Sequence, residues 1–293
     1  MKDRRLFFGN REVITHGLPR RILQDLYHMQ MTARWSALFA TIAGLFVLFN
    51  LGFALLYRLQ PDGIANQNPP GYWGMFFFSI ETVATVGYGD MHPQTVFTHI
   101  LAAVEIFIGM MSVGLIAGIM FSRFSRPIAR FLFADSAVIR TIDGRLTLML
   151  RAANARQNVI MEAQAQLRLI REEETAEHIR IRRIYDLPLR RSQHPVFIFG
   201  WNILHIIDEA SPLHGQSPES MAATRANLLL TVSGSDETTG QTLMARKFYP
   251  PSAVYWNHTF ADILTISDDG SDRFDYTKFN QILPVGAEEL PGP

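Results

Sequence analysis

The stretch GYWGMFFFSIETVATVGYG, residues 71–89, decides the fold. Its first part is apolar but only about a dozen residues long, too short for a helix that crosses a bilayer. Its last part, TVGYG, has no side chain that could serve as a nucleophile or as a metal cage. Irregular backbone at membrane depth is tolerated only where it is buried in protein or lines a watery path. If membrane spans flank this stretch, its glycine-rich end must therefore do one of these two things.

Two long apolar runs flank the stretch. Residues 35–57 contain no charge and would form a helix about 34 Å long, enough for a bilayer core of about 30 Å. Residues 97–121 form a second run with one carboxylate, Glu105, and several small residues suited to close helix contact. We predict two spans, with residues 72–84 between them as a re-entrant pore helix. A carboxylate at mid-depth should face protein or water, so Glu105 makes a structural hydrogen bond or takes part in an ion path.

The basic residues predict the orientation. The first 34 residues carry seven Lys or Arg, residues 58–96 carry one, and Arg123, Arg126 and Arg130 follow the second run. By the positive-inside rule, both termini are cytoplasmic and the connection between the spans is external. We therefore expect a multi-pass protein of the inner cell membrane, with residues 35–126 as the membrane domain.

Composition excludes several classes of function. Hydrophobic residues make up 48% of the 293, which favours a membrane protein with a soluble part. Lys plus Arg equals Asp plus Glu, at 27 each, so net charge does not indicate nucleic acid as a partner. The chain has no cysteine, which excludes disulfides and thiolate catalysis.

Residues 85–89, here called the filter segment, are suited to binding a dehydrated cation. Gly87 and Gly89 can take dihedral angles that are denied to other residues, so successive carbonyls can point to one side. The carbonyls of Thr85, Val86, Gly87 and Tyr88, with the Thr85 hydroxyl, could then line an axis and replace the water around K⁺. One strand supplies one side of each ion cage, and the chain contains the motif once. A homotetramer around a central axis is the simplest closure. We expect K⁺ ions in the filter segment and no cofactor.

The C-terminal part, residues 127–293, reads as a β-sandwich. Apolar and polar residues alternate there with a period of two, and Asp143-Gly144 and Asp269-Gly270 lie between strand-like runs as hairpin turns. One predicted buried face consists of Val159, Met161, Ala163, Ala165, Leu167 and Leu169.

The N-terminal part, residues 1–34, contains a predicted amphipathic helix before the first span. Ile22, Leu26, Met29 and Ala33 share one face, with basic residues elsewhere. We interpret it as a helix that lies in the membrane interface; an ordinary surface helix is the alternative.

These segments resemble the inwardly rectifying potassium channels, most closely the bacterial KirBac branch. The resemblance rests on FFFSIETVATVGYGDMHPQTV, RFSRP, RAANARQNVI, HPVF, IIDEASPL and GSDETT, so it covers nearly the whole chain. It implies a two-span pore domain with an immunoglobulin-like cytoplasmic domain. It also identifies the N-terminal amphipathic helix as a slide helix that couples the two domains.

The resemblance also implies roles for single residues. Phe121 matches the gate where the inner helices cross, and a ring of such side chains would make a dewetted constriction. Val113 matches a cavity position that is acidic in strongly rectifying members, so steep rectification from this site is not expected. Glu81 matches a carboxylate that supports the filter, although its family partner is replaced by Met91. Gly109 is either a hinge or a site of close helix contact.

Three arginines are predicted to contact lipid. Arg34, Arg123 and Arg126 lie at the inner interface, where each basic side chain near anionic lipid is worth about 1 kcal/mol. The resemblance implies that matching positions bind phosphatidylinositol bisphosphate, and in the bacterial branch we expect this lipid to inhibit.

Two other functions compete with a potassium channel. One is a membrane-anchored enzyme or sensor, against which stands the lack of a nucleotide-binding fingerprint or catalytic set after residue 127. The other is a potassium uptake subunit, a class with several degraded filter repeats in one chain, whereas this chain has one intact GYG. We therefore predict a channel and not an enzyme.

Overall fold

The structure, a computed structural model, describes residues 4–8, 11–16, 29–126, 129–156, 158–266 and 272–286. The chain divides into two compact units, Pro19–Arg126 and Met1–Leu18 with Pro127–Pro293. Most of the predicted slide helix, including Ile22 and Leu26, and the predicted turn at Asp269-Gly270 lie outside the described residues. Residues 29–32 are helical.

The described residues of the membrane unit include the helices α2 (Trp35–Tyr57), α3 (Tyr72–Val83) and α4 (Val96–Phe124). Both α2 and α4 are long and apolar enough to cross a membrane. α4 starts one residue before the predicted second span because Thr95 and Thr98 form a capping box, in which each hydroxyl accepts a hydrogen bond from the other residue's backbone amide. It continues three residues past the predicted end, where Arg123 in the last turn suits the negative end of the helix dipole.

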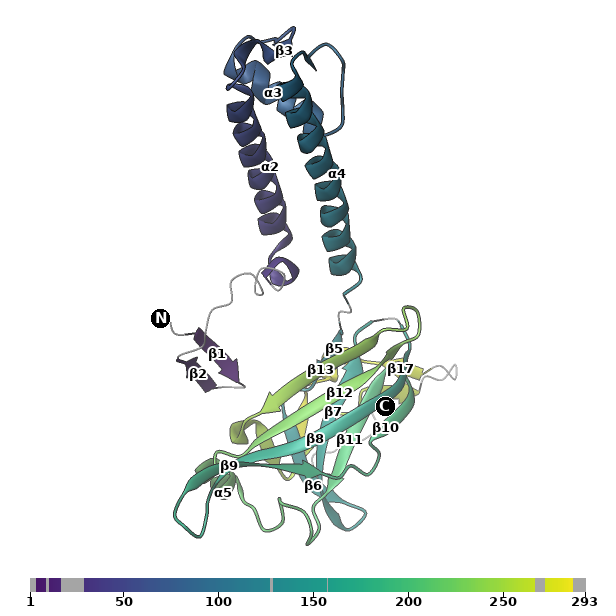
Figure 1. The fold of residues 1–293 in the computed structure, drawn as a ribbon. Helices are drawn as coiled ribbons and strands as arrows, with labels where there is room; N and C mark the ends of the chain where they lie inside the picture. Colours follow the sequence, from purple (N-terminus) through teal and green to yellow (C-terminus); the bar gives the residue numbers. More distant parts are fainter. Residues whose placement is uncertain are drawn as a thin grey trace. The chain divides into compact units, whose positions relative to one another are not determined.

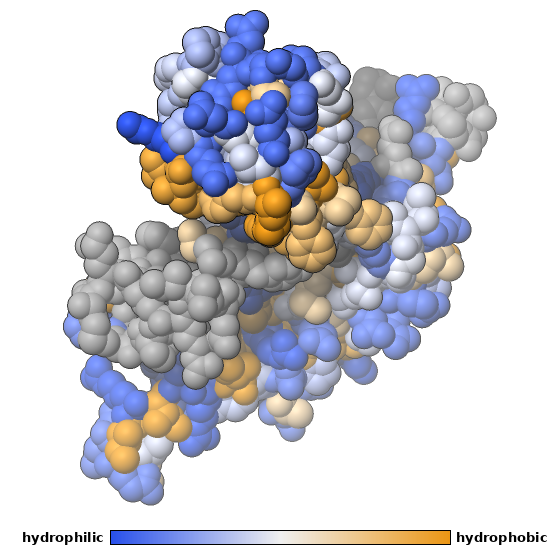
Figure 2. All heavy atoms as spheres, turned by 45° about the horizontal axis from the view of Figure 1, so that its top comes forward, coloured by the Kyte–Doolittle hydropathy of each residue, from blue (hydrophilic) through white to orange (hydrophobic). Residues whose placement is uncertain are grey.

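The short helix α3 packs between α2 and α4 near one end of the pair (Figure 1). The core of this unit contains Phe53 and Tyr57 from α2, Met75 and Phe78 from α3, and Ala102 from α4. Other faces of the long helices expose large apolar side chains, as expected where lipid or protein covers them. Figure 2 shows that the end of the unit nearest α3 is largely hydrophilic, with hydrophobic side chains below it. The large apolar side chains that α2 and α4 expose include Phe39, Leu45, Leu48, Leu55, Ile100, Phe107 and Leu115.

Two five-stranded sheets form the second unit, and one apolar core takes side chains from both of them (Figure 1). The predicted all-β domain is thereby confirmed. One sheet contains β5 (Phe131–Phe133), β6 (Ala137–Ile142), β7 (Arg145–Asn154), β11 (Gly200–Ile206) and β14 (Val254–Trp256). The other contains β8 (Ile160–Glu174), β9 (Arg180–Leu187), β10 (Gln193–Phe197), β12 (Asn227–Asp236) and β13 (Thr242–Tyr249).

Short elements complete the described fold. β1 pairs with β2, β3 with β4, β15 with β18 and β16 with β17, all antiparallel. Their bounds are β1 (Arg4–Phe8), β2 (Arg11–Thr15), β3 (Ile64–Ala65), β4 (His92–Pro93), β15 (His258–Phe260), β16 (Leu264–Ile266), β17 (Asp272–Phe274) and β18 (Ile282–Pro284). The remaining helices are α5 (Pro218–Ala223), η1 (Pro61–Gly63), η2 (Pro251–Ala253) and η3 (Tyr276–Lys278).

One predicted turn is confirmed and one predicted strand face is corrected. Asp143 and Gly144 connect β6 to β7 with φ of 51° and 73°, as a two-residue hairpin requires. In β8 the predicted alternation holds from Ala163 to Leu169 but is wrong before it, because Ile160 is buried and Met161 only half-buried. Glu162 has φ of 49°, and this left-handed residue shifts the alternation by one position.

Candidate ion pathway

The helix α3 delivers the chain to the filter segment. The Tyr72 hydroxyl at its start donates to the carbonyl of Leu51 in α2 over 3.0 Å. At its end, the carbonyl of Glu81 accepts hydrogen bonds from the amides of Val86, at 2.8 Å, and Gly87, at 3.3 Å. The Glu81 backbone therefore holds the first turn of the filter segment, a contribution distinct from the predicted role of its side chain.

The backbone of the filter segment alternates in handedness. Thr85, Gly87 and Gly89 have φ of 55°, 54° and 86°, whereas Val86 and Tyr88 do not have positive φ. In an ordinary strand successive carbonyls point in opposite directions. A left-handed residue at every second position turns alternate peptide units round, so that successive carbonyls can point to the same side. The sequence predicts this freedom at the two glycines but not at Thr85, because a β-branched residue with positive φ is a rare exception.

The outer end of the filter segment is held by the connection from α2. The Asn66 side chain donates to the carbonyl of Asp90 over 3.0 Å, and β3 pairs with β4 just beyond it. Met91, which replaces the partner that the resemblance implies for Glu81, is buried in the core of the membrane unit. Both ends of the filter segment are thus attached to the scaffold of one chain.

The side chains of the filter segment are exposed in the single chain. Val86 is 47% exposed and Tyr88 is 76% exposed, so the irregular backbone of this segment is not enclosed by its own chain. At membrane depth such backbone must be buried in protein or line a watery path. The chain therefore covers the segment on one side, and the open side is left for other protein or for a watery path.

Gly109 lets α4 approach the end of α3. A Cβ atom at this position would lie 2.4 Å from the carbonyl oxygen of Val83, which is closer than any real contact. Close packing accounts for a glycine here, whereas the hinge interpretation stays a prediction.

One face of α4 points away from the helices of its own chain. Val113, Ala117 and Phe121 are spaced by four residues and so form one stripe along the helix. Val113 is 65% exposed and Phe121 is 72% exposed. The predicted cavity and gate positions therefore share a stripe that is open to other protein or to solvent.

The arginines at the inner end of α4 contact the chain just before α2. Arg123 donates to the carbonyls of Gln30, at 3.0 Å, and Ala33, and its guanidinium lies 4.5 Å from the centre of the Trp35 ring. Arg126 donates to the carbonyl of Met31 over 3.2 Å. These bonds satisfy carbonyls at the end of the helical turn 29–32, as basic side chains do at helix C-termini. Arg34, the third predicted lipid residue, is exposed.

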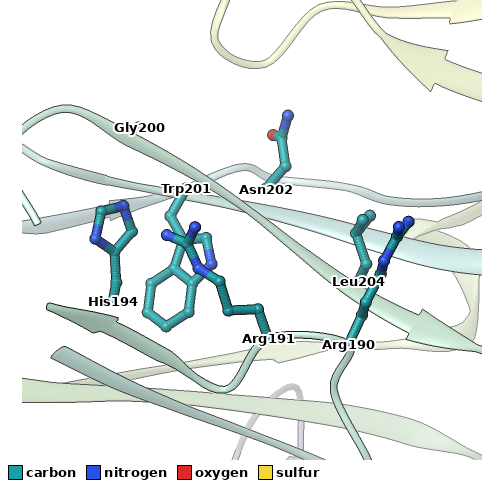
Figure 3. Close-up of a pocket in the computed structure, with 7 residues that line it drawn as sticks. All are labelled: Arg190, Arg191, His194, Gly200, Trp201, Asn202 and Leu204. Carbon is teal, nitrogen blue, oxygen red and sulfur yellow. The ribbon is translucent and has the colours of Figure 1, made fainter.

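The second unit contains a pocket lined by residues just before β10, by the start of β10 and by four of the first five residues of β11 (Figure 3). The Arg191 guanidinium lies 6.0 Å from the centre of the Trp201 ring, and the His194 ring stands edge-on to the same indole. Among the described residues that line the pocket, none is a nucleophile that His194 could activate. The lining is Arg190, Arg191, His194, Gly200, Trp201, Asn202 and Leu204.

Known proteins resemble both units. The family model for the inward rectifier potassium channel C-terminal domain matches residues 131–291, and a family model described as ion channel matches residues 37–126. The chain is 35% identical over 275 residues to the inward rectifier potassium channel Kirbac3.1 of Paramagnetospirillum magnetotacticum, an alignment that covers 94% of this chain and 93% of that protein.

Animal relatives are more distant. The chain is 28% identical over 291 residues to the G protein-activated inward rectifier potassium channel 1 of Homo sapiens, covering 90% of this chain and 57% of that protein. It is also 28% identical over 293 residues to the ATP-sensitive inward rectifier potassium channel 12 of Gallus gallus, covering 91% and 67%. All three relatives are ion channels and not enzymes. The chain therefore belongs to the inward rectifier potassium channel family.

Proposed function

We propose that this chain forms a homotetrameric pore that conducts K⁺ passively and selectively. The observation that carries the proposal is the alternating handedness of residues 85–89. Carbonyls turned to one side can replace the hydration shell of K⁺, and the C-terminal end of α3 adds partial negative charge behind them. The ligands are the carbonyls of Thr85, Val86, Gly87 and Tyr88, with the Thr85 hydroxyl.

The exposure of the filter segment supports a tetramer. One chain leaves the irregular backbone around Val86 and Tyr88 open, and three further copies arranged around one axis would cover it while closing each ion cage. The excess of basic residues at the inner ends supports an orientation in the inner membrane with both termini in the cytoplasm.

Flux measurements test the proposal. The purified chain in proteoliposomes should take up rubidium in a barium-sensitive manner and prefer K⁺ over Na⁺. The control is protein-free vesicles of the same lipid. A lack of barium-sensitive, K⁺-selective flux in every lipid mixture would overturn the proposed function.

We also propose that the pore closes where four Phe121 rings meet at the inner end of α4. Their stripe continues through Ala117 to Val113, which would line the cavity below the filter segment. An apolar ring excludes water and therefore ions. Because Val113 carries no charge, internal cationic blockers would find no attraction at this site, and rectification from it would be weak.

Anionic lipid is proposed to inhibit through the inner arginines. Arg123 and Arg126 hold the turn 29–32 against α4 through backbone carbonyls, which are weaker acceptors than phosphate. A lipid phosphate that binds these guanidinium groups would compete for the bonds between the turn and the inner helix. Such a change would couple the lipid headgroup to the position of α4.

Adding phosphatidylinositol bisphosphate to the vesicles should lower the flux. Arg126→Gln should weaken this inhibition by about fivefold in lipid concentration, since one interfacial basic side chain contributes about 1 kcal/mol. Arg58→Gln, at the opposite end of α2, is the matched control and should leave the inhibition unchanged. A rise in flux with the lipid, or an unaltered response of Arg126→Gln, would contradict the proposal.

A further inference from the structure

Four fully buried polar side chains meet among the helices α2, α3 and α4 of the membrane unit. Asn50 and Tyr57 from α2, Ser79 from α3 and Glu105 from α4 are each 0% exposed. The Tyr57 hydroxyl donates to Glu105 Oε2 over 2.7 Å. Ser79 Oγ lies within hydrogen-bond distance of both Glu105 Oε1 and Asn50 Oδ1, the latter at 2.9 Å. One connected set of hydrogen bonds therefore joins all three helices.

The orientation of Asn50 follows from its second contact. Its Nδ2 atom lies 2.7 Å from the carbonyl oxygen of Phe46, which can only accept a hydrogen bond. The amide nitrogen of Asn50 must therefore face Phe46, so its oxygen faces Ser79. With this orientation, Asn50 Oδ1 requires a donor, and the Ser79 hydroxyl is in place to provide it.

Counting hydrogens then places a proton on Glu105. The Ser79 hydroxyl has one hydrogen, and Asn50 uses it, so the hydrogen between Ser79 and Glu105 must come from the carboxyl group. A carboxylic acid supplies it at Oε1 while Oε2 accepts from Tyr57, and every group is then satisfied. An ionised Glu105 would leave two oxygens competing for one hydrogen. It would also bury a charge whose structural contacts, Tyr57 and Ser79, are both uncharged.

The contact between Glu105 and Ser79 lies one helical turn from a second contact between the same helices. Gly109 follows Glu105 by four residues, and Val83, whose carbonyl it approaches, follows Ser79 by four. The two contacts therefore join α3 and α4 at successive turns. The second of them is two residues from the start of the filter segment, so the position of α3 determines where this segment begins.

We infer that Glu105 is a neutral glutamic acid that donates a hydrogen bond to Ser79 and thereby positions the pore helix α3 and the filter segment. This inference rests on the proposed function for its effect on selectivity, but not for the protonation of Glu105. Glu105 is a positioning residue: it acts on K⁺ through α3 and does not line the ion path.

The test compares Glu105→Gln with Glu105→Leu in the full-length channel. Glutamine keeps one donor and one acceptor without charge, so this variant should retain the K⁺ over Na⁺ permeability ratio and the barium affinity of the original channel. Leucine removes both, and the ratio should fall by about fivefold to tenfold, the equivalent of one buried hydrogen bond. Ser79→Ala removes the other partner of this hydrogen bond, so it should also lower the K⁺ over Na⁺ permeability ratio. It replaces Glu105→Leu as the test variant if the leucine variant does not assemble.

Infrared spectroscopy provides a readout that does not depend on flux. At neutral pH the difference spectrum between the original channel and Glu105→Gln should contain the carbonyl band of a protonated carboxyl group. Three results would each overturn the inference. The first is the absence of this band. The others are a Glu105→Gln variant as unselective as Glu105→Leu, and full selectivity in both Glu105→Leu and Ser79→Ala. Failure of the original channel to conduct K⁺ would instead overturn the proposed function and leave the infrared test in force.

Discussion

Replacing Gly89 by alanine is expected to abolish K⁺-selective flux. Gly89 has φ of 86°, and the space around it in the chain would accept a Cβ atom, so the cost comes from the backbone dihedral angle. A left-handed conformation costs an L-residue roughly 1–2 kcal/mol. In the proposed tetramer the cost is multiplied by four, to roughly 4–8 kcal/mol for each pore. Alanine would therefore favour a right-handed backbone, in which the carbonyl of the preceding peptide no longer faces the ion.

The measurement is barium-sensitive rubidium uptake into vesicles, with the K⁺ over Na⁺ permeability ratio as a second readout. Gly44→Ala is the matched control, because Gly44 lies within α2, has ordinary helical angles and also has room for a Cβ atom. This control should conduct like the original channel. Equal flux and selectivity in Gly89→Ala would show that the handedness of residue 89 does not matter for conduction.

Replacing Phe121 by alanine is expected to raise flux several-fold. If four phenylalanine rings close the inner end of the pore, their removal widens an apolar constriction and lets water and ions enter. Leu115→Ala is the matched control: Leu115 is 64% exposed on the same helix, but its position six residues earlier places it on a different face. It should leave the flux unchanged.

Rubidium uptake and the assembly state must be measured on the same preparation. The gate assignment requires higher flux in a Phe121→Ala channel that still elutes as a tetramer. Unchanged flux in an intact Phe121→Ala tetramer would place the constriction elsewhere on α4, and an equal rise in Leu115→Ala would indicate a general loosening of the helix.

Local sequence patterns predict the elements that one segment can determine alone. The uncharged run 35–57 gives both ends of α2, and Asp143-Gly144 gives the β6–β7 hairpin. In β8 the alternation fails at Glu162, since a left-handed residue there does not follow from an alternating pattern. Thr85 is a similar case: its conformation opposes the preference of threonine and depends on the surrounding structure.

The buried polar set depends on contacts that no single segment contains. Glu105 stands out in the sequence as a lone carboxylate in an apolar run, which shows that it needs a partner. Its partners come from two other helices, and Ser79 lies in an otherwise apolar stretch with no periodic signal of its own. Only the packing of α3 between α2 and α4 brings these residues together.

Attachment of the filter segment at both ends restricts how it can change. The Glu81 carbonyl holds the amides of Val86 and Gly87, and Asn66 holds the carbonyl of Asp90. If one peptide unit between these anchors rotates, the residues beyond the anchors stay in place. A second peptide unit between the anchors must then rotate in the opposite sense. Non-conducting forms of this segment should therefore be few and discrete. A single channel would then switch abruptly between current levels instead of drifting gradually from one to another.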